Sequence, residues 1–281
     1  MRERTYKAPA GAHHEETMAA MQNILLASLP RKEYLKLLPD LSPVTLAFGD
    51  VLYEPGTPMK EVYFPNASLV SLLTIVEGHL AIEVGLVGRE GMVGIALALG
   101  VDVSPVRALV QGAGPALRMG RGKFLSALRS SPPLQRALNT YIHALMGQIT
   151  QTAACNRFHV VEARLARWLL MTRDRVGSGD FRMTQEFLSH MLGVRRVGVT
   201  QAASAFQRQN LIEYSRGHIR ILDHHGLEAA CCSCYAAGSD AKTLWGPART
   251  VRAAKHPRSV ATPSVATPSP AEREVPMEEA I

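Results

Sequence analysis

The spacing of apolar residues along the chain changes from a strand-like to a helix-like pattern near residue 130. From residue 44 to about residue 119, short runs rich in Val, Leu, Tyr and Phe are separated by turn-forming pairs such as Gly49-Asp50 and Pro55-Gly56. Short strands with turn residues between them are typical of an antiparallel sandwich or barrel. From about Pro133 onward the apolar period is helical. The pattern therefore predicts an α+β protein, with an antiparallel β domain followed by helices.

One long helical pattern covers residues 134–155, which contain no proline and a single glycine. Its apolar positions alternate spacings of four and three, as in the seam of a coiled coil. The seam positions are Leu138, Ile142, Leu145, Ile149 and Thr152, with Asn156 continuing the series. We therefore expect two copies of the chain to pair along this helix. Packing of the same stripe against the chain's own β domain is the alternative.

Residues 183–201, MTQEFLSHMLGVRRVGVTQ, predict two short helices joined by a tight turn. Thr184 is a good N-cap for the first helix, and Gly193 supplies the left-handed conformation that such a turn needs. The side of the second helix that should pack against the first consists of Val199, Ala202, Ala203 and Phe206. Together these features predict a helix-turn-helix.

The outward side of the second helix carries no acidic residue. It consists of Val197, Thr200, Gln201, Ser204 and Arg208, with Arg195 and Arg196 at the start of the helix. Positive charge at a helix N-terminus opposes the helix dipole, so the paired arginines indicate an anionic partner. Arginine can bind a guanine edge bidentately and glutamine can bind adenine. The surface is therefore a candidate recognition helix that enters the DNA major groove by its N-terminus.

The stretch LIEYSRGHIRILD, after the second helix, predicts a β-hairpin that turns at Arg216-Gly217. Such a hairpin would form a wing beside the helix-turn-helix. Its residues Arg216 and His218 would then lie near the DNA backbone.

The charge distribution fits a nucleic-acid partner. The formal net charge is +7, and residues 157–220 hold eleven arginines, no lysine and five acidic residues. Most of the excess charge thus lies around the helix-turn-helix, as binding to double-stranded DNA requires. No apolar run approaches the ~18–20 residues of a membrane span. The N-terminus lacks the apolar core of a secretory signal. We therefore expect a cytoplasmic protein with no membrane partner.

Three of the four cysteines, Cys231, Cys232 and Cys234, lie within four residues. With His224 and His225 upstream they are candidate metal ligands. The group lacks C-x₂-C spacing, however, and adjacent cysteines seldom both bind one ion. Ordinary reduced thiols are therefore the preferred interpretation, and we expect no metal and no other cofactor.

The segment TQEFLSHMLGVRRVGVTQAASAFQRQNLI resembles the DNA-binding domain of the cyclic-AMP receptor protein/fumarate–nitrate regulator (Crp/Fnr) family, notably in its QNLI ending. The resemblance covers roughly residues 23–235. It implies an antiparallel β-roll similar to cyclic-nucleotide-binding domains, a long dimerisation helix and a winged helix-turn-helix. The expected parts are a flexible N-terminus (1–22), the β-roll (23–130), the dimerisation helix (131–158), the winged helix-turn-helix domain (159–235) and a disordered tail (236–281).

By position, the resemblance assigns Arg196 to reading guanine and Thr184 to a phosphate contact. Gln201 stands at the position of a second base-reading arginine of the cyclic-AMP receptor. Val197 stands where many members have a glutamate that reads cytosine, and a thymine methyl group would suit valine better. The usual operator of the family is therefore in doubt for this chain.

The segment that would hold a cyclic nucleotide departs from the family pattern. In GMVGIALALG, Ile95 replaces the ribose-binding glutamate, and Ser104 falls at the position of the phosphate-binding arginine. Arg107 is two or three positions displaced. Burying a phosphate without a positive partner is costly, so we do not expect a cyclic nucleotide to bind.

These observations predict a sequence-specific transcriptional regulator that binds a pseudo-palindromic operator as a homodimer, with RNA polymerase as a further candidate partner. The alternative is a regulatory module that does not bind DNA, whose β-roll senses a ligand and whose helices bind a protein. No hydrolase, metalloprotease, Walker or dinucleotide-binding motif occurs, so we do not expect an enzyme.

Overall fold

The computed structural model describes residues 23–75 and 81–238. The N-terminus predicted to be flexible, and all but the first three residues of the tail predicted to be disordered, lie outside the described residues. None of the described helices combines the length and the apolar character that crossing a bilayer requires.

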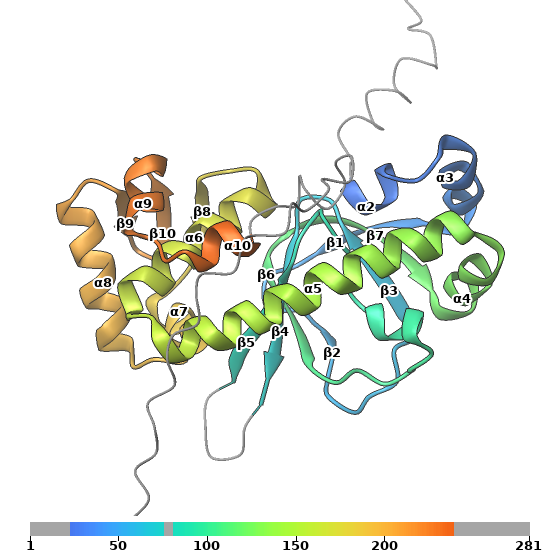
Figure 1. The fold of residues 1–281 in the computed structure, drawn as a ribbon, viewed down its shortest axis with the longest axis horizontal. Coiled ribbons are helices and arrows are strands. Elements are labelled where there is room, and N and C mark those ends of the chain that lie inside the picture. The colour runs from blue at the N-terminus through green and yellow to red at the C-terminus, as the bar shows by residue number, and fades with distance from the viewer. Residues whose placement is uncertain (1–22, 76–80, 239–281) are drawn as a thin grey trace, which may run out of the picture. The chain divides into compact units, whose positions relative to one another are not determined.

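The N-terminal part is an antiparallel β-roll, as predicted (Figure 1). It is preceded by α2 (Ile24–Ala27), α3 (Arg31–Leu37) and η1 (Leu38–Asp40). One sheet has the order β1 (Ser42–Leu46), β7 (Gly114–Gly120), β3 (Glu61–Pro65). The other has the order β2 (Val51–Tyr53), β6 (Arg107–Gly112), β4 (Leu69–Thr74), β5 (Ile82–Val87). The short helix η2 (Ile95–Leu99) lies between β5 and β6 in the chain.

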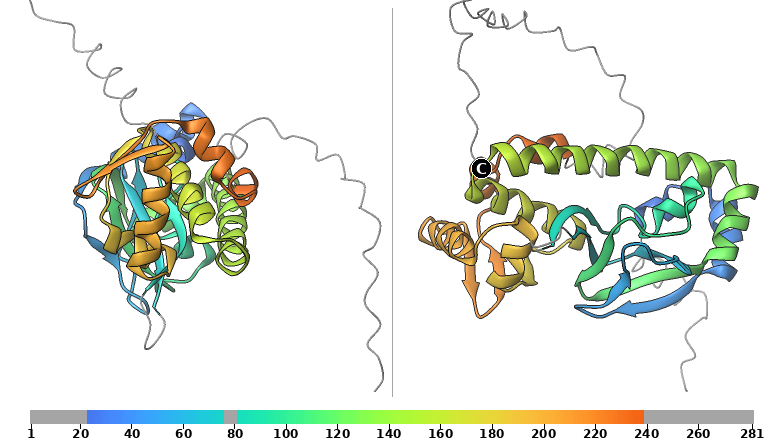
Figure 2. Two further views of the ribbon diagram at one scale, coloured as in Figure 1. Left: turned by 90° about the vertical axis from the view of Figure 1, so that its left-hand side faces the viewer. Right: turned by 90° about the horizontal axis from the view of Figure 1, so that it is seen from below.

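Two helices close the core of the roll. They are α4 (Arg121–Ser130) and α5 (Pro132–Phe158). Ser131 caps α5 by accepting a hydrogen bond from the Leu134 amide, and Pro132 begins the helix where no backbone donor is needed. Phe64 from the sheet, Phe124 from α4 and Tyr141 from α5 are buried together in this core. The first half of α5 is thereby packed against the roll (Figure 2).

The structure corrects the predicted seam of α5. Leu138 is 1% exposed and Leu145 is 7% exposed, both within the core of the chain's own roll. Thr152 and Asn156 are half-buried and accept hydrogen bonds from Arg167 and Arg164. For these four positions the alternative of packing within the chain is the correct one. The helical period was predicted correctly. A repeat of four and three does not show, however, whether the apolar side packs against the chain's own roll or against a second copy.

A different apolar stripe of α5 faces outward. It consists of Ile142, Met146, Ile149 and Ala153, which also alternate spacings of four and three. Ile142 is half-buried, whereas Met146 is 63% exposed and Ile149 is 37% exposed. Of the predicted seam, Ile142 and Ile149 therefore belong to the outward stripe.

The C-terminal part is a winged helix-turn-helix, again as predicted (Figure 1). Its helices are α6 (Val161–Val176), α7 (Gln185–Leu192), α8 (Arg196–Arg208), α9 (His224–Ala230) and α10 (Cys234–Gly238). Its sheet has the order β8 (Asp180–Arg182), β10 (His218–Ile221), β9 (Ile212–Ser215), with both pairs antiparallel. Leu169, Leu188, Val199 and Ile219 are fully buried in its core, one from each of four elements.

Two buried polar contacts join α6 to the roll. Trp168 Nε1 donates to Glu83 Oε1 at 3.0 Å, and Arg175 Nε donates to Glu90 Oε1 at 2.8 Å. Burial raises the pKa of Glu83 to about 7, against the hydrogen bonds from Ser71 and Trp168, which lower it. Removing one partner of a buried ion pair leaves an uncompensated charge, so the Arg175–Glu90 pair holds α6 to the roll in one arrangement.

Candidate nucleic-acid interface

The first helix of the motif, α7, begins and ends at the residues predicted from the sequence. The Thr184 side chain accepts a hydrogen bond from the Phe187 amide at 3.2 Å, which caps the helix. Gly193 ends it with φ of +59°. The positive φ favours glycine, and a Cβ atom here would approach the end of the Ile82 side chain to 2.9 Å.

The second helix, α8, has a buried side and an exposed side. Val199, Ala202, Ala203 and Phe206 are buried, which confirms the predicted packing surface. The two alanines allow α8 to approach its neighbours closely, and it contacts both α6 and α7. The remaining surface of α8 is therefore held in a fixed orientation by its own core.

The exposed side of α8 carries the candidate DNA-reading residues. Arg195 precedes the helix as an N-cap without a side-chain cap bond, and Arg196 is its first residue. The fully exposed members of the predicted set are Arg195, Arg196, Val197, Gln201 and Arg208. No acidic side chain interrupts this surface, because α8 contains none. Val197 is 64% exposed, so its apolar side chain is accessible to a partner.

Thr200 and Ser204 are half-buried and less accessible than the other members. Thr200 Oγ1 lies 3.0 Å from Gln185 Oε1 and 3.0 Å from the Arg196 carbonyl oxygen. Thr200 therefore contributes to the junction of α7 with α8 as well as to the outward surface.

The predicted hairpin is present as β9 and β10. Arg216 and Gly217 form its turn with φ of +48° and +76°. Two positive φ values match the right-handed twist of the flanking strands. Tyr214 anchors the hairpin by donating a hydrogen bond to the Met183 carbonyl at 2.9 Å. Burial raises the pKa of Tyr214, and the nearby Arg196 guanidinium acts in the opposite direction.

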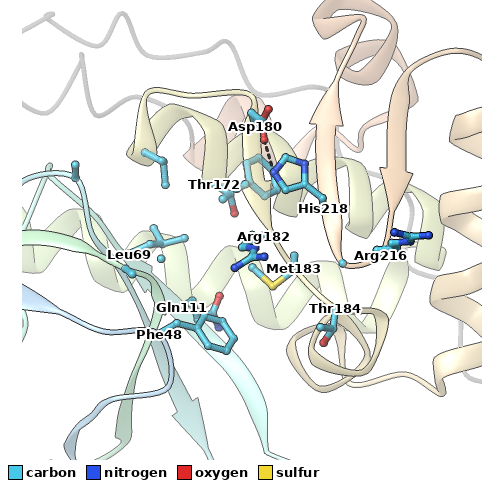
Figure 3. Close-up of a pocket in the computed structure, with 16 residues that line it drawn as sticks. Phe48, Leu69, Gln111, Thr172, Asp180, Arg182, Met183, Thr184, Arg216 and His218 are labelled. Carbon is cyan, nitrogen blue, oxygen red and sulfur yellow. Dashed lines mark ion pairs between the residues drawn. The ribbon is translucent and has the colours of Figure 1, made fainter.

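A pocket of about 660 Å³ lies between the wing and the roll (Figure 3). Phe48, Leu69 and Gln111 line it from the roll. Three predicted DNA contacts line it from the other side, namely Thr184, Arg216 and His218. His218 Nε2 pairs with Asp180 Oδ1 at 2.9 Å. Thr184 at the start of α7 and the wing residues Arg216 and His218 therefore lie beside the same pocket. The α8 residues are not among those that line it.

The segment compared with a cyclic-nucleotide site has internal partners for its polar groups. Ile95 begins the short helix η2. Ser104 is buried and donates a hydrogen bond to the Val106 carbonyl at 2.7 Å. The Arg107 guanidinium pairs with Glu54 at 2.9 Å, so its charge already has a carboxylate partner.

The structure corrects the predicted candidate metal ligands. His224 and His225 contact Glu228 and do not join the cysteines. Cys232 and Cys234 instead lie beside Cys155 and His159 at the end of α5. Sequence reasoning missed His159, although the Cys155-x₃-His159 spacing at a helix end was a signal for it.

The comparisons with known proteins agree with this geometry. The family model described as the Crp-like helix-turn-helix domain matches residues 163–230. A search of curated proteins found no match. Many solved structures share the fold.

Three of these structures serve as examples. A Crp/Fnr-family regulator from Eubacterium rectale is 16% identical with a TM-score of 0.57, over 74% of this chain and 97% of that chain. FixK2 from Bradyrhizobium japonicum is 14% identical with a TM-score of 0.59, over 69% of this chain and 98% of that chain. The c-di-GMP-responsive regulator CLP from Xanthomonas campestris is 14% identical with a TM-score of 0.57, over 69% and 100%.

Residues 163–230 thus match the model of a Crp-like helix-turn-helix domain. The chain as a whole has the fold of the Crp/Fnr transcriptional regulators, which confirms the resemblance predicted from the sequence.

Proposed function

We propose that this chain is a sequence-specific regulator of transcription that binds double-stranded DNA as a homodimer. The observation that carries the proposal is the exposed side of α8, which has no acidic residue and begins with two exposed arginines. An ordinary solvated helix surface mixes both signs of charge. A surface with only positive charge, at the N-terminus of a helix fixed by its core, suits the major groove.

Three exposed residues of α8 have a preferred base contact. Arg196 would bind guanine O6 and N7, and Gln201 would bind adenine N6 and N7. Val197 would pack against a thymine methyl group. Arg195 and Arg208, with Thr184, Arg216 and His218 at the wing, would contact the phosphate backbone and fix the register. Thr200 and Ser204 would complete the DNA-facing surface of α8, between the base-reading and the phosphate-contacting residues.

The outward stripe of α5 supports dimerisation with a second copy of the chain. Ile142, Met146, Ile149 and Ala153 form a coiled-coil pattern that the described part of the chain leaves exposed or half-exposed. A two-fold dimer would present two copies of α8 about one DNA turn, ~34 Å, apart. A pseudo-palindromic operator would mirror that symmetry. The site of action would be the cytoplasm, and RNA polymerase is the further partner that such regulation implies.

We infer that regulation does not use a cyclic nucleotide. Ile95 and Ser104 cannot replace the charged groups that ribose and phosphate require, and Arg107 is paired with Glu54. The proposed function also assigns no catalytic role to any residue.

A regulatory module that binds a protein is the second candidate, favoured by the exposed Val197. An apolar side chain beside arginines could pack against a protein surface just as it could pack against a thymine methyl group. The salt dependence of DNA binding separates the two candidates.

We expect affinity for the selected operator to fall by about 1000-fold between 50 and 200 mM salt, for about six phosphate contacts per dimer. Fluorescence anisotropy with labelled duplex at several salt concentrations measures this slope. Arg208→Ala should make the slope shallower by roughly one unit per half-site, because one phosphate contact is lost. An affinity independent of salt would contradict a contact made by arginines and would favour the protein-binding module.

A further inference from the structure

Three cysteines and one histidine converge where α5 ends. Cys155 lies in the last turn of α5, and His159 directly follows that helix. Cys232 lies just before α10, and Cys234 is the first residue of α10. The four candidate ligand atoms all lie within 4.8 Å of one another. We infer that these four residues bind one zinc ion. Zinc with three cysteines and one histidine is a common structural site in proteins.

The distances within the group match the ligand shell of a single ion. The sulfurs of Cys155 and Cys232 are 3.6 Å apart, and Cys234 Sγ lies 3.5 Å from His159 Nδ1. Around tetrahedral zinc, with bonds of about 2.0–2.3 Å, neighbouring ligand atoms are separated by roughly 3.5–3.8 Å. An iron–sulfur cluster would spread its protein ligands farther apart, over several metal atoms. A mononuclear site therefore fits the group better than a cluster does.

The charges around the group favour an anionic centre. Three thiolates, a neutral imidazole and Zn²⁺ have a net charge of −1. Arg164 and Arg167 of α6 are buried, and neither forms an ion pair with any residue that the structure describes. The Nε atoms of both also lack a hydrogen-bond partner there. The zinc centre would supply the negative charge that these two guanidinium groups lack.

One further contact supports a thiolate ligand at Cys234. Gln151 Nε2 donates a hydrogen bond to Cys234 Sγ at 2.8 Å, as outer-shell groups do in metal sites. Zinc binding would replace the three thiol protons, which pass to solvent, so atoms and charge balance.

The proposed ion would fix a junction of the fold. His159 lies between the end of α5 and the start of α6, and α10 packs against both helices. Zinc would therefore tie the segment that follows α9 to the connection between the long helix and the DNA-binding domain. None of the proposed ligands belongs to α8, so zinc binding can be tested separately from DNA binding.

The test measures metal in the full-length protein, purified under reducing conditions, by elemental mass spectrometry. We expect about one zinc per chain. Titration of the metal-free wild-type chain with Co²⁺ should give the intense visible bands of a tetrahedral site and a thiolate-to-cobalt charge-transfer band. A weak octahedral spectrum, or zinc well below one per chain after incubation with Zn²⁺, would overturn the inference. This measurement needs no variant.

Matched variants assign the ligands. Cys234→Ser should weaken zinc binding by about 100-fold or more, because a thiolate ligand is lost, whereas Cys231→Ser should bind as wild type does. His159→Ala should lose affinity and His159→Cys should restore it. Equal behaviour of the Cys231 and Cys234 variants would contradict the ligand set. A Cys155–Cys232 disulfide, found by peptide mass analysis of the protein purified under reducing conditions, would also contradict it.

Discussion

Replacing Met146 with aspartate is expected to convert the proposed homodimer to a monomer and to weaken operator binding by about 100- to 10,000-fold. Met146 lies in the centre of the outward stripe of α5 and is 63% exposed within one chain. Two aspartates in the seam of a dimer would be desolvated and would repel each other. Binding of the second half-site would then no longer be intramolecular, which is the source of the expected loss. Sedimentation velocity and duplex anisotropy measure the two effects.

Thr140→Asp is the matched control, because Thr140 is exposed on the same helix but does not belong to the stripe. It should remain dimeric and bind DNA as wild type does. Leu145 is unsuitable for this test, since it is buried in the roll and its replacement would destabilise the chain itself. Tight operator binding by Met146→Asp as a proven monomer would contradict dimerisation through this stripe.

Arg196→Ala should weaken binding to the selected operator by about 1–3 kcal/mol per half-site, which is roughly 5- to 150-fold. The same variant should lose discrimination at one base pair of each half-site, because the bidentate contact to guanine disappears. Anisotropy with the operator and with duplexes substituted at each position measures both quantities. Circular dichroism verifies the fold, which should not change, since Arg196 is exposed.

Arg129→Ala removes the same charge from an exposed position on α4 and serves as the control. It should change the affinity by much less than Arg196→Ala and should leave discrimination unchanged. If both variants lost the same affinity at every base pair, the arginines would act only through net charge. A base-reading role for Arg196 would then be wrong.

The parts of the fold that follow from local pattern could be predicted from the sequence. Short strands separated by turn residues predicted an antiparallel β domain, and the side of α8 with Ala202, Ala203 and Phe206 predicted the helix-turn-helix packing. Gly193 and the Arg216-Gly217 turn have positive φ values, which glycine favours, so the positions of these turns could also be predicted from the sequence. In each case the residues that determine the structure are close together in the chain.

Features that depend on distant segments could not be predicted in the same way. The heptad pattern of α5 identified a helix, but Leu145 and Met146 are adjacent, and only the position of the roll decides which of them is buried. Of the proposed zinc ligands, the sequence indicated Cys232 and Cys234 as candidates, but Cys155 and His159 were missed for a related reason. Cys155 and Cys232 are 77 residues apart, and their proximity depends on the packing of α10 against α5.

The most direct test of the account is selection of bound duplexes from a random DNA pool with the purified full-length protein. Two copies of the outward surface of α8, held by the α5 stripe, should enrich an inverted repeat. The centres of its half-sites should be about 10–10.5 base pairs apart, and each half-site should contain a guanine that Arg196→Ala no longer selects. Failure to enrich any sequence, or enrichment of a single half-site without its inverted copy, would contradict the account.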